Sequence, residues 1–487
     1  MSERGALALV LHSHMPYVEG FGTWPFGEEW LWEATAMVYL PLIETLREAP
    51  VTVGLTPVLC DQLETLTGAA GERLRAFLRE VRLPLHAEDA KGLERGGEIA
   101  AAAEVRRAAG DYADAIPVLE ASGGDLVGAF ARLASDASGP ELMASAATHA
   151  VLPLLATTGG RRLQIEAGTA AHARRFGARP ATFWLPECAY EPGLEELLAE
   201  GGVAAFCVDQ TDALGLGAPE QLEPVATTAG PVAVPIDWQT VALVWDEHGG
   251  YPSHPEYRDY HARTIHDLKP WSNAGGVYDP TAAREVAAEH ARDFVRRAGE
   301  RLEAYRSARG RPGLLCCPLD TELLGHWWYE GRAWLATVLA EAQAQEVDLL
   351  PLAAALESVE PITGRVLAPS TWGIAKDLST WDSSRVADLA FAARRAELRV
   401  VAVAHARAAR RRALARAARE LLALQASDWA FQVTRELAAD YPRSRARAHA
   451  AELEAALEAA LADSRPEPDA TLGNLAPELD LTPLVAP

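Results

Sequence analysis

The chain has 487 residues, and its 45 Lys and Arg against 68 Asp and Glu give a formal net charge of −23. A field of this sign repels phosphate backbones and anionic lipid headgroups, which excludes nucleic acid and membrane surfaces as expected partners. Because 49% of the residues are hydrophobic and 23% are charged, the composition is that of a globular protein and excludes general disorder.

The first apolar run, from Ala6 to Leu11, is too short for the core of a signal peptide. No apolar stretch approaches the roughly 20 residues that span a membrane. The five cysteines form no CxxC pair, so neither a disulfide framework nor a thiolate zinc site is indicated, and a reducing compartment fits. We therefore expect a cytoplasmic protein.

Seven short apolar runs have the character of buried strands, and they end in polar or ring-bearing residues. Helix-forming stretches rich in Ala, Leu and Glu lie between them, an alternation typical of a parallel sheet or barrel. Polar residues confined to the strand ends favour a barrel with an active site on one face, and an open doubly wound sheet is the alternative. The runs are residues 6–11, 51–55, 143–147, 181–186, 204–208, 232–236 and 314–319.

Residues 61–142 interrupt this alternation, because helix-forming stretches dominate there without a convincing strand. We expect a helical insertion within a catalytic domain of residues 1–375. The segment 376–464 predicts a C-terminal helical domain, and its Arg-rich part, 394–419, is interpreted as a solvated helix surface with local acidic partners and not as a polyanion site. The last residues, 465–487, carry five prolines and predict a tail that is either disordered or laid over the body of the protein.

Two histidines end the first predicted strand. In an extended chain, residues two apart face the same side, so His12 and His14 can enter one cavity. Such a pair serves either a metal site completed by a carboxylate, as in barrel-type carbohydrate deacetylases, or hydrogen bonding to sugar hydroxyls. The pair alone leaves both interpretations open.

Two carboxylic acids stand at the ends of later strands, among aromatic residues. Glu187 follows Pro186, which stops the strand and presents the acid instead of pairing it. Asp320 ends the last predicted strand, shortly before His326 and three consecutive aromatic residues. Glycoside cleavage needs two such carboxyls, one as nucleophile and one that protonates the leaving oxygen. The 13 tryptophans are consistent with carbohydrate binding, and a structural ion pair at Glu187 together with core packing of the tryptophans is the alternative.

The strand ends and their neighbours form five longer segments, namely residues 12–17 (HSHMPY), 147–155 (ATHAVLPLL), 184–190 (WLPECAY), 320–328 (DTELLGHWW) and 370–373 (STWG). In this order they resemble the motifs of glycoside hydrolase family 57, and within it those of the 1,4-α-glucan branching enzymes. Residues 427–429 (SDW) resemble the helical C-terminal region of the branching enzymes. The resemblance covers nearly the whole chain and implies a (β/α)7 barrel with an inserted helical subdomain.

The resemblance also implies the roles of individual residues. Glu187 is expected to be the nucleophile and Asp320 the general acid/base of a retaining transglycosylation that needs no metal and no cofactor. The enzyme is expected to cleave an α-1,4-glucan and transfer the cleaved chain to a 6-OH of an acceptor glucan, which forms an α-1,6 branch. The expected substrate-binding residues are His12, His14, His149, Trp30, Tyr251, Trp271, Trp372, Trp381 and Trp429, and packing is the alternative for the last four tryptophans.

The chain departs from the family pattern in two places. Residues 374–377 (IAKD) stand where branching enzymes have a glutamate and glycines, and the segment after Tyr251, whose side chain is expected to cover the donor site, is shortened. The same two carboxyls would serve an α-amylase or a 4-α-glucanotransferase, so these activities are the alternatives. A metal-dependent carbohydrate deacetylase and a non-catalytic glucan-binding protein are the further alternatives.

Overall fold

The computed structural model describes residues 4–246, 249–406, 411–461 and 472–486. Its centre is a ring of seven parallel strands in the order β1-β2-β3-β4-β5-β7-β8. β8 pairs with β1, and a parallel bridge between Ile236 and Cys316 joins the end of β7 to β8. The backbone N–H of Asp237 donates to the carbonyl of Cys316 at 2.8 Å, which closes the ring. The expected (β/α)7 barrel is therefore confirmed.

The barrel strands coincide with the predicted apolar runs to within a few residues. Such runs carry no polar alternation because both faces of a strand in this fold are covered, one by the barrel interior and one by helices. Two further strands, β6 (Val225–Ala226) and β9 (Asp348–Leu349), went unpredicted because two residues carry no periodic signal. The barrel strands are β1 (Gly5–Ser13), β2 (Thr52–Leu55), β3 (Glu141–Ser145), β4 (Thr182–Trp184), β5 (Ala205–Val208), β7 (Val232–Pro235) and β8 (Gly313–Asp320).

Helices surround the barrel. The longest of those described, α12 (Pro280–Arg309), begins and ends at residues that favour helix termini. Asp279 caps its first turn by accepting a hydrogen bond of 2.8 Å from the N–H of Thr281, and Gly310 ends it in the left-handed conformation. A π-helical turn, Thr35–Tyr39, joins the first two helices. The helices are α1 (Glu28–Ala34), α2 (Leu40–Thr45), α8 (Thr158–Phe176), α9 (Leu194–Glu200), α10 (Thr211–Leu214), α11 (Trp238–Trp245), α12 (Pro280–Arg309), α13 (Gly331–Ala344) and α14 (Leu352–Leu356).

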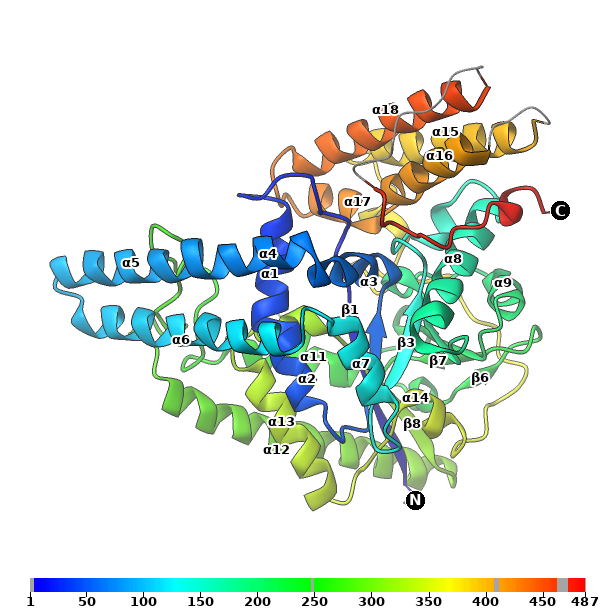
Figure 1. Cartoon of the computed structure of the whole chain (residues 1–487). Coiled ribbons are helices and arrows are strands. Elements are labelled where there is room, and N and C mark those ends of the chain that lie inside the picture. Colours follow the sequence, from blue (N-terminus) through cyan, green and yellow to red (C-terminus); the bar gives the residue numbers. More distant parts are fainter. Residues whose placement is uncertain (1–3, 247–248, 407–410, 462–471, 487) are drawn as a thin grey trace.

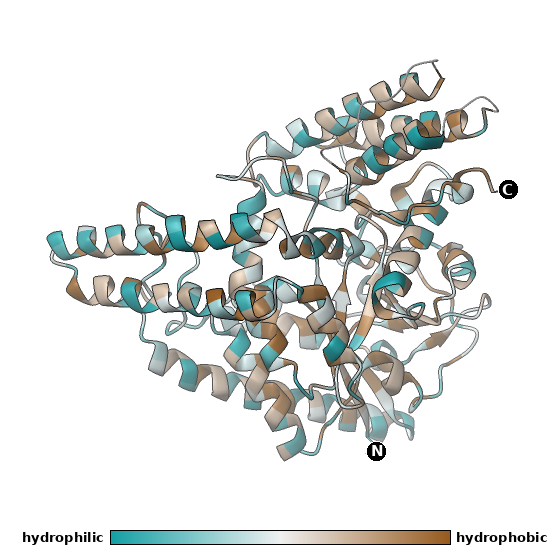
Figure 2. Ribbon diagram, viewed as in Figure 1, coloured by the Kyte–Doolittle hydropathy of each residue, from teal (hydrophilic) through white to brown (hydrophobic). Residues whose placement is uncertain are grey.

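Helices also fill the segment predicted as an insertion. α5 and α6 pack against each other as a hairpin that projects from the barrel, at the left of Figure 1. Hydrophilic residues alternate with hydrophobic ones along this hairpin in Figure 2, as in helices that bury one face. The expected first residue of the insertion, 61, falls inside a helix. The helices are α3 (Pro57–Glu64), α4 (Ala69–Ala76), α5 (Leu83–Arg95), α6 (Ile99–Ala121) and α7 (Leu126–Ala134).

A second group of helices lies beyond the arrowhead end of β1 (Figure 1). Two of its arginines have nearby acidic partners, Arg394 with Asp382 and Arg399 with Glu454, each pair at 2.8 Å. These contacts are of the kind expected for the Arg-rich stretch, of which residues 407–410 lie outside the described residues. The helices are α15 (Ala387–Ala404), α16 (Arg411–Leu424), α17 (Ser427–Thr434) and α18 (Tyr441–Leu461).

The predicted boundary between the C-terminal helices and the tail, at residue 464, lies outside the described residues. The part of the tail that is described, 472–486, lies on the body of the protein. Leu472 and Leu475 are fully buried in one apolar cluster with Tyr17 and Val58. The described part of the chain contains no helix that combines the length and the apolar character needed to cross a bilayer.

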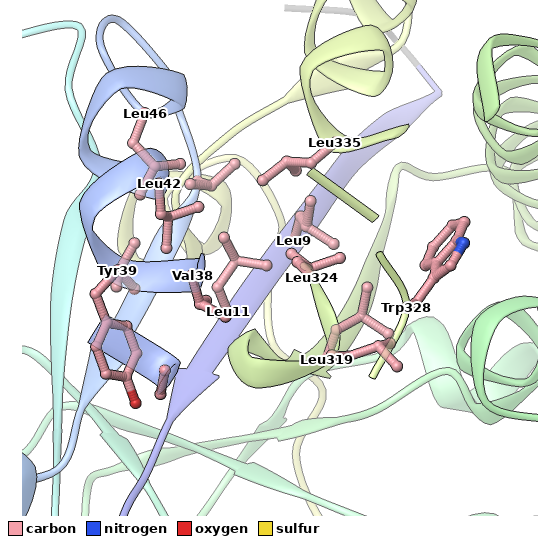
Figure 3. Close-up of a cluster of buried hydrophobic side chains, with 14 of the residues drawn as sticks. Leu9, Leu11, Val38, Tyr39, Leu42, Leu46, Leu319, Leu324, Trp328 and Leu335 are labelled. Carbon is pink, nitrogen blue, oxygen red and sulfur yellow. The ribbon is translucent and has the colours of Figure 1, made fainter. Parts of the chain in front are cut away.

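The outer face of β1 packs against helices in the largest apolar cluster (Figure 3). Burying a large aliphatic side chain contributes about 1.5–3 kcal/mol. The cluster therefore fixes the positions of β1 and β8, and with them the start of the segment that follows each strand. Polar residues can then be placed accurately at the strand ends. The labelled members are Leu9, Leu11, Val38, Tyr39, Leu42, Leu46, Leu319, Leu324, Trp328 and Leu335.

Candidate active site

A cavity of about 1640 Å³ lies at the carboxyl ends of the barrel strands. Its lining is drawn from the barrel, the helical insertion and the C-terminal helices. A space of this size exceeds the 300–1,000 Å³ usual for small-molecule sites and suits a chain-like ligand. The structure brings eight of the predicted site residues to it, namely His12, His14, His149, Glu187, Asp320, Trp30, Trp372 and Trp381.

Glu187 follows β4 in an unusual backbone conformation. Its φ of 61° and ψ of 22° lie in the left-handed region, which non-glycine residues seldom adopt. Trp372 Nε1 donates to Oε2 of Glu187 at 2.9 Å, and Ser427 Oγ donates to Oε1 at 2.8 Å. Burial raises the pKa of Glu187, and these two hydrogen bonds oppose the rise because they favour the ionised form. The carboxylate is therefore both presented and held in one orientation.

Asp320 is the last residue of β8 and lies beside His12 in the register of the sheet. Within the described chain, nothing donates a hydrogen bond to its carboxyl. Burial raises the pKa of Asp320 well above its usual value, and the nearby carboxyls of Glu322 and Glu187 raise it further. Asp320 is therefore suited to hold a proton near neutral pH, whereas Glu187, with its two donors, is the one to ionise.

His12 and His149 form a hydrogen-bonded pair against Glu187. Their Nε2 atoms lie 3.0 Å apart, and Nδ1 of His149 lies 2.9 Å from Oγ of Ser427. Burial, followed by the neighbouring imidazoles, lowers the pKa of both histidines well below the usual value. Both rings are consequently neutral, so each has one donor and one acceptor nitrogen.

His14 has different surroundings. Its Nε2 lies 2.8 Å from Oδ2 of Asp428, and its Nδ1 lies 3.2 Å from the hydroxyl of Thr56. Burial lowers the pKa of His14, but the attraction and hydrogen bond of Asp428, together with the charges of Glu322 and Glu187, outweigh it, and the pKa is raised overall. His14 is the imidazole of the cluster that carries positive charge most readily, and its ring stacks on His149 at a centroid distance of 4.1 Å.

Three of the predicted aromatic residues do not line the cavity. Tyr251 is buried, donates to Asp293 at 2.8 Å and stacks on His290, so in this structure it does not cover the donor site. Trp429 is a core residue whose Nε1 donates to the carbonyl of Ala423 at 2.8 Å. Trp271 lies outside the lining, paired through its backbone with Val277. Substrate contacts of these three residues stay predictions.

Several polar residues of the site were not predicted. Ser427 contacts Glu187, and Asp428 contacts His14, and both residues lie at the start of α17. Glu322 lines the cavity two residues after Asp320, and burial raises the pKa of Glu322 to about 7. The segment Ser427-Asp428-Trp429 resembles the branching enzymes, but the resemblance implies a binding role only for Trp429. A polar pair at the start of a predicted helix could have been flagged as a cap or a site.

The histidines are not arranged as metal ligands. Nε2 of His12 faces His149 and Nε2 of His14 faces Asp428, so the two nitrogens point at different protein partners. Among the residues that the structure describes, no cluster of three or more His, Cys, Asp or Glu side chains could hold a metal ion. The geometry therefore gives no support to the deacetylase alternative for His12 and His14.

Comparisons with known proteins identify the family to which this fold belongs. A model of glycosyl hydrolase family 57 matches residues 8–236, and a model of the C-terminal region of 1,4-alpha-glucan branching enzyme matches residues 389–478. The crystal structure of a GH57-type branching enzyme from Pyrococcus horikoshii is similar with a TM-score of 0.90 and 30% identity, covering 99% of this chain and 97% of that chain.

Two curated relatives extend the similarity over most of the sequence. The 1,4-alpha-glucan branching enzyme of Thermococcus kodakarensis is 33% identical over 499 residues, covering 92% of this chain and 72% of that protein. A probable 1,4-alpha-glucan branching enzyme of Mycobacterium tuberculosis (strain CDC 1551 / Oshkosh) is 34% identical over 499 residues, covering 92% of this chain and 90% of that protein. Since this similarity spans both the barrel and the C-terminal helices, the chain belongs to glycosyl hydrolase family 57.

Proposed function

We propose that the protein is a 1,4-α-glucan branching enzyme, which cleaves an α-1,4-glucan and transfers the released chain to a 6-OH of an acceptor glucan. Relatives named as branching enzymes are 33–34% identical over 92% of the chain. The match to the C-terminal region of such enzymes covers α15 to α18. The substrate is accordingly an α-glucan, and donor and acceptor are both chains of this type.

The opposite surroundings of Glu187 and Asp320 carry the proposed mechanism. Two donors hold Glu187 as a carboxylate, so we assign it the attack on the anomeric carbon. Asp320 has a raised pKa and, among the described residues, no hydrogen-bond donor, so we assign it protonation of the leaving oxygen and later deprotonation of the acceptor hydroxyl. Two carboxyls whose pKa values are set apart in this way are the pair that retaining glycoside chemistry requires.

The same cavity supplies residues for holding the sugar chain. Trp30 and Trp372 are partly exposed and offer aromatic surface, whereas Trp381 lines the cavity but is mostly buried. His12, His14 and His149 line the cavity near the carboxylates, with ring nitrogens that are directed mainly at protein partners. An acceptor hydroxyl reacts in preference to water when it is held close to the anomeric carbon, because positioning contributes several powers of ten in rate. We infer that these residues bind the two glucan chains. The five cysteines are buried free thiols, which suits the reducing cytoplasm that we propose as its location.

An α-amylase or a 4-α-glucanotransferase would use the same two carboxyls, so the product decides between them. The test is incubation of the protein with amylose, with proton NMR to count α-1,6 linkages and a reducing-sugar assay to count new chain ends. We expect α-1,6 signals to exceed new reducing ends. Reducing ends without α-1,6 signals would instead make the protein a hydrolase, and altered chain lengths with neither would make it a 4-α-glucanotransferase. Amylose binding without α-1,6 linkages, new chain ends or altered chain lengths would make the protein a glucan-binding protein without catalytic activity.

Variants of the two carboxyls test the assigned roles. Glu187→Gln should remain folded and lose all turnover, because an amide cannot attack the anomeric carbon. Asp320→Asn should lose most activity on amylose but retain more on an aryl glycoside, whose leaving group needs no proton. Substantial activity of Glu187→Gln on amylose would overturn the assignment of the nucleophile.

A further inference from the structure

Ser427 stands where a helix of the C-terminal group meets the catalytic carboxylate. It is the first residue of α17 and is buried, and its hydroxyl lies 2.8 Å from Oε1 of Glu187. Its backbone N–H donates to the carbonyl of His149 at 3.2 Å, and an antiparallel bridge pairs Ala426 with Ala150. The position of the hydroxyl is therefore fixed by the backbone as well as by its own hydrogen bonds.

Hydrogen bonds connect Glu187, Ser427, His149 and His12 in series, and the ionised state of Glu187 determines which group donates in each of them. An ionised Glu187 can only accept, so the single hydrogen of Ser427 points to Oε1. Ser427 Oγ must then accept from Nδ1–H of His149. In a neutral imidazole the other nitrogen is an acceptor, so Nε2 of His149 accepts from Nε2–H of His12. The remaining nitrogen, Nδ1 of His12, carries no hydrogen, which agrees with its being buried without a partner in the part of the chain that the structure describes.

Three hydrogen bonds thus run in one direction, from His12 through His149 and Ser427 to Glu187. Hydrogen bonds in such a chain polarise one another, and a low-dielectric site strengthens them. The pKa values of His12 and His149, lowered by burial, are consistent with the neutral tautomers that this direction needs. A protonated His149 would carry a hydrogen on Nε2, directed at the nitrogen of His12 3.0 Å away.

We propose that Ser427 is a positioning residue for the nucleophile, and that its hydroxyl, oriented by the His149–His12 pair, holds Glu187 ionised and aimed at the anomeric carbon. The inference rests on the proposed function of Glu187. It gives the C-terminal helices a part in the reaction, because α17 supplies one of the two donors that hold the nucleophile.

The proposed contribution involves no proton transfer from Ser427. In the first step, an oxygen of Glu187 bonds to the anomeric carbon while the glycosidic bond breaks, and the proton of Asp320 goes to the leaving oxygen. In the second step, the acceptor hydroxyl bonds to that carbon and gives its proton to Asp320, and the bonding electron pair returns to Glu187. Negative charge then reappears on the carboxylate, where the Ser427 hydroxyl stabilises it.

The test compares kcat and the pH dependence of kcat/KM of Ser427→Ala with those of the natural chain. Loss of the donor should lower kcat by about 10- to 100-fold. It should also raise the pKa of Glu187, so that the acidic limb of the pH profile moves to higher pH by about one unit. The other groups acting on Glu187 are Trp372, Asp428 and His14, and the substitution leaves all three in place.

Thr434→Ala is the matched control. Thr434 closes the same helix, and its hydroxyl donates to the carbonyl of Thr380 at 2.7 Å, so the control removes one side-chain hydrogen bond of α17 away from the carboxylates. We expect the control to keep the pH profile of the natural chain. Ser427→Thr retains the hydroxyl and should restore most of the acidic limb. Circular dichroism and thermal unfolding identify any variant that fails to fold, in which case Ser427→Cys, with its weaker donor, replaces Ser427→Ala and should give a smaller shift.

A folded Ser427→Ala variant with the natural acidic limb would overturn the inference, as would an equal shift in Thr434→Ala. Glu187→Gln, measured in the same assay, separates this failure from a failure of the proposed function. If Glu187→Gln is inactive and Ser427→Ala is unaffected, then Glu187 is the nucleophile but Ser427 is only a structural residue. If Glu187→Gln is active, the assignment of the nucleophile is wrong.

Discussion

Trp372 contacts Glu187 twice, once through its side chain and once through its backbone. The indole Nε1 donates to Oε2 at 2.9 Å, and the backbone N–H of Trp372 donates to the carbonyl of Glu187, also at 2.9 Å. Ser370 and Tyr190 exchange two further backbone hydrogen bonds beside them, at 2.9 and 3.1 Å. Together these contacts hold the left-handed backbone of Glu187, and they explain how a strained residue can be kept at a strand end.

Trp372→Phe should therefore impair catalysis more than folding. The phenyl ring keeps much of the packing but cannot donate to Oε2, so the pKa of Glu187 rises and the acidic limb of kcat/KM moves to higher pH, with a loss of about 10-fold in kcat. Trp334→Phe is a suitable control, because Trp334 is fully buried in the core without a hydrogen-bond partner for its Nε1 among the described residues. Equal pH profiles for both variants would contradict the prediction.

Glu322→Gln should move the alkaline limb of the pH profile of kcat/KM, and not the acidic limb. The charge of Glu322 helps to raise the pKa of Asp320, and activity is lost as the pH rises through that pKa because the general acid deprotonates. Removing the charge lowers the pKa of Asp320, so the alkaline limb should shift to lower pH by about half a unit. The amide oxygen of Gln can still accept the bonds from Tyr39 and from the N–H of His14.

The control for this variant is Glu360→Gln, at an exposed carboxyl after α14, which should leave both limbs in place. An unchanged alkaline limb in Glu322→Gln would show that Glu322 does not influence the ionisation of the acid.

Dialysis against a chelator should leave the activity on amylose intact. The proposed chemistry uses only two carboxyls and hydrogen-bond donors, and the Nε2 atoms of His12 and His14 are each directed at a protein partner. The measurement is the rate of α-1,6 linkage formation before and after chelation, with and without added zinc. Activity that disappeared and returned with a divalent ion would favour a metal-dependent hydrolase over the transglycosylation.

Leu335→Ala tests the packing that fixes β1 and β8. Leu335 is fully buried in the cluster of Figure 3, so truncation leaves a cavity and should lower the free energy of unfolding by about 2–5 kcal/mol. Leu398→Ala, at a side chain that is 55% exposed, should change it by less than about 0.5 kcal/mol. Chemical denaturation followed by circular dichroism measures both values. Similar losses in the two variants would contradict the account of the core.

The sequence by itself was sufficient to predict the barrel and to place Glu187 and Asp320 at the ends of its strands. Apolar runs mark the seven strands because burial on both faces removes polar residues from a continuous local segment. Glu187 and Asp320 follow two of these runs directly, so their place at the strand ends is also a local property. The two-residue strands β6 and β9 escaped prediction, since their pairing depends on neighbours and not on a pattern of their own.

Only the tertiary structure decided which distant side chains complete the site. Ser427 reaches Glu187 across 240 positions and Asp428 reaches His14 across 414, and no local pattern encodes contacts of that range. The same holds for the tryptophans, because an indole such as Trp429 looks identical in the sequence whether packing turns it toward the core or toward a cavity. Charge state is also decided at this level. Glu187 and Asp320 are both buried strand-end acids, and their pKa values are set apart by the hydrogen-bond donors that other segments bring to Glu187 and by the carboxyls that lie near Asp320.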